Sequence, residues 1–305
     1  MKDLVNNLKN LEAETFKNLR SSKSDNTIRA YKADFEDFKN FCVNNKLSYM
    51  PSIPKVLAIY LTHLSKNSRF STLKRRLASI KIIHRSKGHY LDIKHPLIVE
   101  NLLGIKRKIG SFQRSKKPIL INDLKLIIRA INQSNEKFLK KLRDKTLVLV
   151  GFAGGFRRSE IVALERNDIE FVSEGVKIFI KRSKTDQSGE GMTKAIPYFI
   201  NEDLCPVTSL KSYINQKNII KGKIFGISDK SVALIIKKYA NLAGLEMTKY
   251  SGHSLRSGFA TSTAEMGAEE RSIMAMTGHK SNQMVRRYIR EADLFKNNAL
   301  NKLKI

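Results

Sequence analysis

The chain has 305 residues, 41% of them hydrophobic, and its 57 Lys and Arg against 28 Asp and Glu give a formal net charge of +29 at pH 7. This length allows two domains with separate cores, and the composition excludes an intrinsically disordered chain. No apolar run is long enough to span a membrane, and the charged N-terminal residues do not resemble a secretory signal, so we expect a cytoplasmic protein.

The basic excess is present in both halves of the chain rather than in a tail. A polyanion that touches both halves is the natural partner, and nucleic acid is favoured over a membrane surface. The alternative is a lysine-rich protein whose charge serves solubility alone. The two cysteines, Cys42 and Cys205, lie far apart and outside any CxxC motif, so neither a disulfide scaffold nor a cysteine zinc site is expected.

The N-terminal part is predicted to be a helical bundle over residues 1–107. Apolar residues recur there at spacings of three and four. They predict four helices, at 24–45, from Pro54, from Ser71 to a stop at Gly88, and at 96–107. Three histidines of this part have no partners in the sequence and are interpreted as structural: His84, His89 and His95.

The third predicted helix has a basic outer face. Such a face is either ordinary solvated surface or a helix that contacts DNA, and both interpretations remain open from the residues alone. The candidate DNA-binding residues on and beside this helix are Arg69, Lys74, Arg75, Lys81 and Arg85.

Residues 108–117 have little apolar periodicity and are predicted to link the bundle to a second domain, 118–305. The second domain is predicted to be mostly helical, with one small antiparallel sheet, so the fold class is mainly α. The sheet is expected from β-type runs at 176–180 and 194–199, joined by the loop TDQSGEG. Helices are expected at 122–133, 137–153, 158–164, 206–217, 230–242, 256–266, 269–276 and 281–290.

Two arginine segments in this domain suit a phosphodiester. The planar guanidinium gives two parallel hydrogen bonds and stays charged, so two arginines from different segments could hold both non-bridging oxygens. Arg256 in SGHSLRSG is one candidate, and the segment GFRRSE supplies Arg157 or Arg158 at the start of a helix. Glu160 could orient such an arginine by pairing with it.

A tyrosine that attacks phosphorus needs help at neutral pH, because its ordinary pKa is about 10. Cationic neighbours and a histidine within hydrogen-bond reach would supply that help. Tyr288 follows two histidines, His253 and His279, near the C-terminal end of the chain. It is one of nine tyrosines, and by residue type alone a packing role is favoured.

The ordered set of motifs closely resembles the tyrosine recombinase (phage integrase) family, with its Cre-type and Xer-type site-specific recombinases. The resemblance rests on GFRRSE, RSKTD, HSLR, TGHKS and RRYIRE, and the N-terminal bundle resembles the family's core-binding domain. It implies a catalytic domain over 118–305 that cuts and rejoins DNA strands for integration, excision or inversion. The catalytic residues that it implies are Arg157, Lys184, His253, Arg256, His279 and Tyr288, with Glu160 in support.

The resemblance also implies what each residue does. Tyr288 would form a 3′-phosphotyrosyl link, two arginines would hold the phosphate, and Lys184 would protonate the departing 5′-oxygen. His253 would act in proton transfer, and His279 would hydrogen-bond the phosphate or steady the tyrosine. Family register selects Arg157 over Arg158. Lys184 is preferred because it follows the first strand directly, and Lys181, Arg182 and Lys194 remain alternatives.

The family also implies partners. We expect duplex DNA with specific recombination sites, a homotetramer in the synapse, a location at the nucleoid and possible accessory DNA-bending proteins, with neither cofactor nor metal.

Two alternative functions would share part of this set of motifs. A type IB topoisomerase-like relaxing enzyme would use the same residues, and a DNA-binding factor with an inactive site would keep the fold alone.

Overall fold

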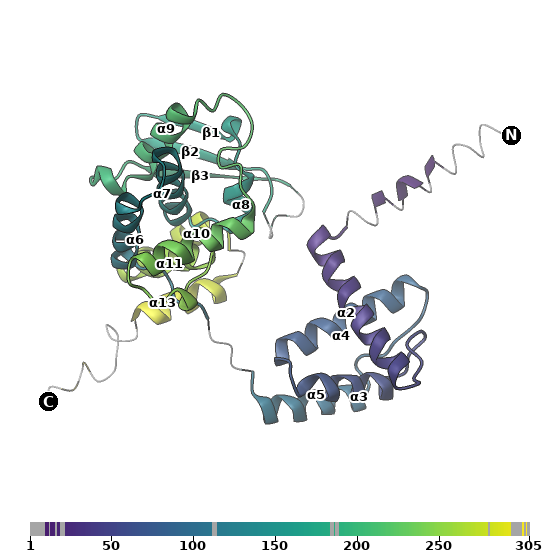
Figure 1. Ribbon diagram of the computed structural model, residues 1–305. Coiled ribbons are helices and arrows are strands. Elements are labelled where there is room, and N and C mark those ends of the chain that lie inside the picture. The colour runs from purple at the N-terminus through teal and green to yellow at the C-terminus, as the bar shows by residue number, and fades with distance from the viewer. Residues whose placement is uncertain are drawn as a thin grey trace. The chain divides into compact units, whose positions relative to one another are not determined.

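The computed structural model in Figure 1 describes residues 10, 11, 13–15, 17, 18, 22–111, 115–183, 186, 189–279, 281–293, 301 and 303. The chain divides into two compact units, Met1–Arg114 and Ser115–Ile305, each with its own hydrophobic core. In the described part of the chain, no helix combines the length and apolar character needed to cross a bilayer.

Residues 22–111 of the first unit form four helices, and the helical bundle predicted there is confirmed. They are α2 (Asp25–Asn44), α3 (Pro54–Ser65), α4 (Phe70–Ser86) and α5 (Pro96–Ile109). Packing pairs α2 with α4 and α3 with α5, as Figure 1 shows. Proline occupies the first position of α3 and of α5, where its missing N–H is not needed and its φ is already helical.

The core of this unit holds two polar side chains in defined roles. His84 is buried; its Nδ1 donates to the carbonyl of Ile80, and its Nε2 accepts from the backbone N of Ser52. Burial lowers the pKa of His84, which keeps it neutral and suits the structural role expected for it. Asp34 on α2 is also buried and accepts from Ser79 and Arg75 on α4, so it ties these two helices together.

The second unit is mostly helical with one small sheet, as predicted. Figure 1 shows the sheet at one end of the unit and α11 and α13 at the other. The helices are α6 (Ile121–Gln133), α7 (Phe138–Ala153), α8 (Arg158–Ala163), α9 (Pro206–Lys217), α10 (Asp229–Leu242), α11 (Ser254–Glu265), α12 (Glu270–Thr277) and α13 (Asn282–Asp293). Because α7 is buried along most of its length, α6, α9, α10 and α11 can all pack against it.

The sheet has three antiparallel strands in the order β1-β2-β3. They are β1 (Ile169–Val172), β2 (Gly175–Ile180) and β3 (Met192–Pro197). The sequence predicted only the last two, and it placed β3 two residues too late. A four-residue strand shows too little alternation to be recognised, and pairing with β2 decides that β1 forms. Pro197 ends β3 because it cannot donate to a further ladder bond.

The start of α11 also differs from the prediction. The helix begins at Ser254 rather than Arg256, and His253 is the residue immediately before it. The backbone N of Ser251 donates to Ser254 Oγ, and the backbone N of Ser254 donates to the carbonyl of Ser251. This turn places His253 and Arg256 on one short, fixed segment.

Candidate active site

The first side of the site is the turn between α7 and α8. After α7 ends at Ala153, Gly155 adopts a φ of +55°, which glycine takes without strain. A Cβ on Gly154 would lie 2.1 Å from Cε2 of Phe156, so the turn closes tightly over that ring. The turn delivers Arg157 to the position just before α8.

Glu160 fixes Arg157 at two points. Its Oε2 accepts from the backbone N of Arg157 at 2.9 Å, and its Oε1 accepts from the guanidinium Nη1 at 2.6 Å. Glu160 is buried, and charge-assisted bonds of this length hold both partners firmly. The neighbouring Arg158 is exposed, and its side chain lies over Gly252, where an added Cβ would meet Arg158 Cδ at 2.0 Å.

Arg256 forms the second cationic group and is 1% exposed. Its Nη1 donates to the carbonyl of Gly155 at 2.8 Å, so it is bound to the same turn that carries Arg157. Its Nη2 is buried and donates to no group among the described residues. Burial and the charge of Arg157 lower the pKa of Arg256 to about 10, which still leaves it charged at neutral pH. A buried cationic donor without an acceptor indicates a site for an anion.

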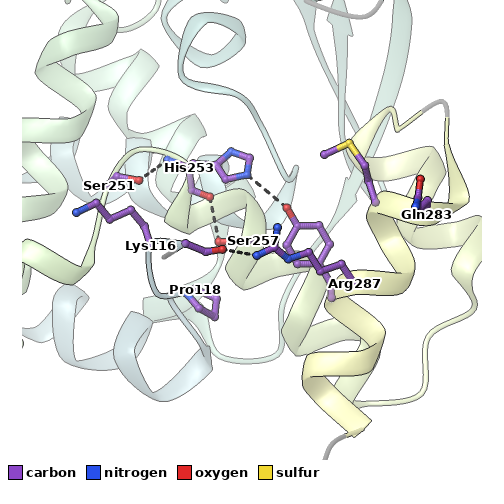
Figure 2. Close-up of a pocket in the computed structure, with 10 residues that line it drawn as sticks. Lys116, Pro118, Ser251, His253, Ser257, Gln283 and Arg287 are labelled. Carbon is purple, nitrogen blue, oxygen red and sulfur yellow. Dashed lines mark hydrogen bonds between the residues drawn. The ribbon is translucent and has the colours of Figure 1, made fainter. Parts of the chain in front are cut away.

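Tyr288 on α13 meets His253 at the mouth of this site. Its hydroxyl lies 3.3 Å from Nε2 of His253, and the dashed line from the imidazole ring of His253 in Figure 2 marks this hydrogen bond. The ring is 9% exposed and packs with Ala260, Ile273 and Val285, which join α11, α12 and α13 into a small core. The phenolic oxygen therefore sits at a fixed point beside a possible proton acceptor.

His279 lies behind the tyrosine, with the two ring centroids 6.1 Å apart. Thr277 donates its hydroxyl proton to the carbonyl of Ile273, so it accepts from Nδ1 of His279 at 2.7 Å. This assignment leaves the other ring nitrogen, Nε2, as the acceptor of a neutral imidazole. Burial and the nearby charges of Arg256 and Arg157 lower the pKa of His279 to about 4, so the ring is neutral at pH 7 without a bound anion.

Four cationic residues in or next to the sheet were considered as the proton donor to the 5′-oxygen, and their environments differ. The preferred lysine, Lys184, lies outside the described residues. Lys181 forms ion pairs with Glu165 and Asp168 at 2.7 and 2.9 Å, and Arg182 is exposed. Lys194 alone of the described three is buried, and its Nζ donates to the carbonyl of Gly154 at 2.6 Å.

Comparison with known proteins places this site in a family. Residues 122–294 match the family described as the phage integrase family. The chain belongs to the phage integrase family. It is a tyrosine recombinase, as its motifs predicted, and its expected activity is therefore site-specific DNA recombination.

Two curated relatives of this recombinase are similar over most of their length. An "Integrase/recombinase xerD homolog" from Selenomonas ruminantium is 38% identical, over 98% of this chain and 91% of that protein. A "Tyrosine recombinase XerD" from Staphylococcus epidermidis is 25% identical, over 87% of each chain.

The fold of the recombinase is shared with solved structures at lower sequence identity. A XerH site-specific recombinase bound to a palindromic difH substrate matches with a TM-score of 0.61 and 18% identity, over 81% of this chain and 73% of that one. A lambda integrase tetramer bound to a Holliday junction matches with a TM-score of 0.58 and 17% identity, over 93% and 78% of the two chains.

An open pocket of about 770 Å³ lies in front of the tyrosine of the recombinase. Its wall includes two basic residues that the sequence did not single out, Lys116 and Arg287, which Figure 2 labels beside His253. Lys116 donates to the carbonyl of Thr248, and Arg287 donates to Ser115 Oγ. Lys116 lies outside the family motifs and Arg287 stands beside the motif tyrosine, and only the folded chain brings the start of this unit against α13.

The candidate DNA-binding cations on and beside α4 are all exposed, and they differ in their partners. Lys81 and Arg85 are exposed one turn apart and border an open hollow with Tyr90, which is 85% exposed. Arg69 and Lys74 are also exposed, whereas Arg75 is paired with the buried Asp34. The charge of Arg75 is therefore partly balanced within the protein, and Lys81 and Arg85 are the stronger candidates for contact with a polyanion.

Proposed function

We propose that this recombinase cuts DNA by attack of Tyr288 on a phosphodiester held between Arg157 and Arg256. The observation that carries the proposal is the buried Nη2 of Arg256, which donates to no described group. A phosphate oxygen is the acceptor that suits a guanidinium in this position, because the pair is charge-assisted and planar. The phenol of Tyr288 and the imidazole of His253 stand at the same site.

The two arginines have a second role once the reaction begins. Negative charge on the non-bridging oxygens increases in the transition state, and fixed donors stabilise it without having to reorganise. Glu160 holds the Arg157 guanidinium and Gly155 holds that of Arg256, so both donors are already in place. Both guanidinium groups are therefore oriented before a phosphate binds.

The strand-cleavage step exchanges one phosphorus–oxygen bond for another. Tyr288 Oη bonds to phosphorus as the 5′-oxygen leaves, and the product is a 3′-phosphotyrosyl ester. The phenolic proton passes to His253 Nε2, which lies 3.3 Å away, and Lys184 supplies the proton for the 5′-oxygen. The ester keeps the bond energy, so attack by a 5′-hydroxyl rejoins a strand by the reverse of these steps.

The partner is duplex DNA at a specific site, and the first unit acts as a core-binding domain. Support comes from the basic excess of both units and from the exposed cations of α4. Solved relatives of the same fold are bound to DNA sites, one of them as a tetramer on a Holliday junction. We infer that four copies pair two sites in the synapse, which would place the protein at the nucleoid.

Cleavage is expected to proceed in EDTA. The cations of Arg157 and Arg256 flank the proposed phosphate position, so they can supply the charge stabilisation that a metal ion gives in other phosphotransfer enzymes. The measurement is accumulation of protein–DNA adduct on nicked duplexes drawn from the DNA that flanks the gene. The same reaction with added Mg²⁺ is the control, and an absolute need for the ion would contradict the mechanism.

Removing the exposed cations of α4 is expected to weaken DNA binding without changing the chemistry. In K81A/R85A, the slope of log affinity against log salt should decrease by about two, because two phosphate contacts are lost. Adduct formation at saturating protein should stay within about twofold of wild type. K55A, which removes an exposed cation from α3, is the matched control. An unchanged slope in the double variant would show that this face does not contact DNA.

A further inference from the structure

Lys194 occupies an inward-facing position of β3, where an apolar residue is usual. It faces the core side of β3 together with Ile196, pairs across the sheet with Ile178, and is 1% exposed. Burying an ammonium group is strongly unfavourable unless its donors find partners. The contacts of this side chain therefore indicate what it does.

Its contacts are with the turn that precedes Arg157. Nζ donates to the carbonyl of Gly154 at 2.6 Å and lies 4.4 Å from the ring centroid of Phe156. The next carbonyl, that of Gly155, accepts from Arg256. Two adjacent carbonyls at the C-terminal end of α7 are thus held by cations from two different elements, where the helix dipole favours positive charge.

The electrostatics of the position are finely balanced. Glu160 on α8 attracts the ammonium group, whereas the charges of Arg157 and Arg256 repel it. Burial is the largest effect and lowers the pKa of Lys194 to about 7, with the two arginines acting in the same direction. A phosphate bound between the arginines would offset their charge and favour the protonated lysine.

We propose that Lys194 is a positioning residue, which holds the Gly154–Phe156 turn so that Arg157 is presented to the scissile phosphate. This inference rests on the proposed function and adds a residue to it. Lys194 acts on a backbone carbonyl, that of Gly154, rather than on the reacting atoms. Strand β3 is in this way connected to the turn before Arg157 by one hydrogen bond.

The alternative is that Lys194 itself donates the proton to the leaving 5′-oxygen. Two substrates separate these roles. A substrate with sulfur in place of the bridging 5′-oxygen releases a thiolate, which needs no proton because a thiol has a pKa of about 8.5. Such a substrate would restore cleavage to a variant that lacks the proton donor, and would not restore it to a variant whose Arg157 is misplaced.

The experiment is a double-variant cycle in the full chain, with K194M, R157A and the combination. Adduct formation is followed on a nicked duplex, where product accumulates because it cannot be rejoined, and rates are expressed per bound protein. We expect K194M to be slower by about tenfold to a hundredfold, the effect of a small misplacement at a reacting centre. In the R157A background the same change should alter the rate by less than about twofold.

The controls separate this role from a merely structural one. K194Q is measured in the same double-variant cycle, so the result does not depend on the folding of one variant. K181M is the matched control, because it removes an ion-paired lysine next to the same sheet. K181M is expected to cleave like wild type. Additive effects of K194M and R157A, full activity of K194M, or rescue by the sulfur substrate would each overturn the proposal. If wild-type protein forms no adduct, the proposed function itself fails instead.

Discussion

Replacing Tyr288 with Phe is expected to abolish adduct formation and to leave DNA affinity unchanged. The change removes only the phenolic oxygen, so the attacking group and its hydrogen bond to His253 are lost together. The ring still packs against Ala260, Ile273 and Val285, and the fold of this part should therefore be kept. Adduct is measured by trapping on a nicked duplex, and affinity by gel shift on the intact site.

The assignment of the nucleophile is tested at the same time by mapping. Mass spectrometry of the wild-type adduct should find the nucleotide on Tyr288, attached through a 3′-phosphate. Tyr198→Phe is the matched control, since this tyrosine belongs to the same unit and is exposed. An adduct on another tyrosine, or substantial cleavage by Tyr288→Phe, would show that the nucleophile is wrongly assigned.

Replacing Arg256 with Ala is expected to slow cleavage by at least about a hundredfold, the effect of losing one fixed donor to an oxyanion. Arg157→Ala should act similarly, because the two guanidinium groups serve the same phosphate. DNA affinity should fall far less, since most phosphate contacts lie elsewhere. Rates come from single-turnover trapping at saturating protein, so that binding and chemistry are measured separately.

Arg158→Ala is the control for the choice between the two adjacent arginines. Its side chain is exposed and lies over Gly252, whereas Glu160 pairs with Arg157, so a small effect is expected. Full activity of Arg157→Ala together with an inactive Arg158→Ala would mean that the roles are exchanged. A large loss of DNA affinity in Arg256→Ala would instead assign that residue to binding rather than to the transition state.

Local sequence patterns were sufficient for most of the helices. The N-terminal helices have regular apolar spacing and clear starts, such as Pro54 and Pro96, and they form close to where they are predicted. Strand β1 was missed because four residues carry too little pattern, and its formation depends on pairing with β2. The start of α11 moved to Ser254 because side-chain and backbone hydrogen bonds with Ser251 begin the helix before the apolar pattern does.

In the candidate site, too, some features follow from the sequence and others depend on packing. The motif residues were found because their order along the chain is specific to a family, and a motif is visible without any knowledge of packing. Arg75 on α4 is exposed as predicted, but the sequence did not indicate that a buried carboxylate from α2, distant in sequence, pairs with it. Lys194 remained one alternative among several lysines, because its alternation on β3 says only that it faces inward, not what it meets there.

By itself, the sequence determined the family, the reaction class and the two-unit, mainly helical plan of this recombinase. Those conclusions depend on motif order, charge and local periodicity, which are properties of the chain alone. Only the tertiary structure decided that Arg256 is buried with an unsatisfied donor and that Lys194 and Arg256 hold adjacent carbonyls of one turn. The physical reason is that burial and hydrogen-bond partners arise when distant segments pack together, and no local pattern records which segments will meet.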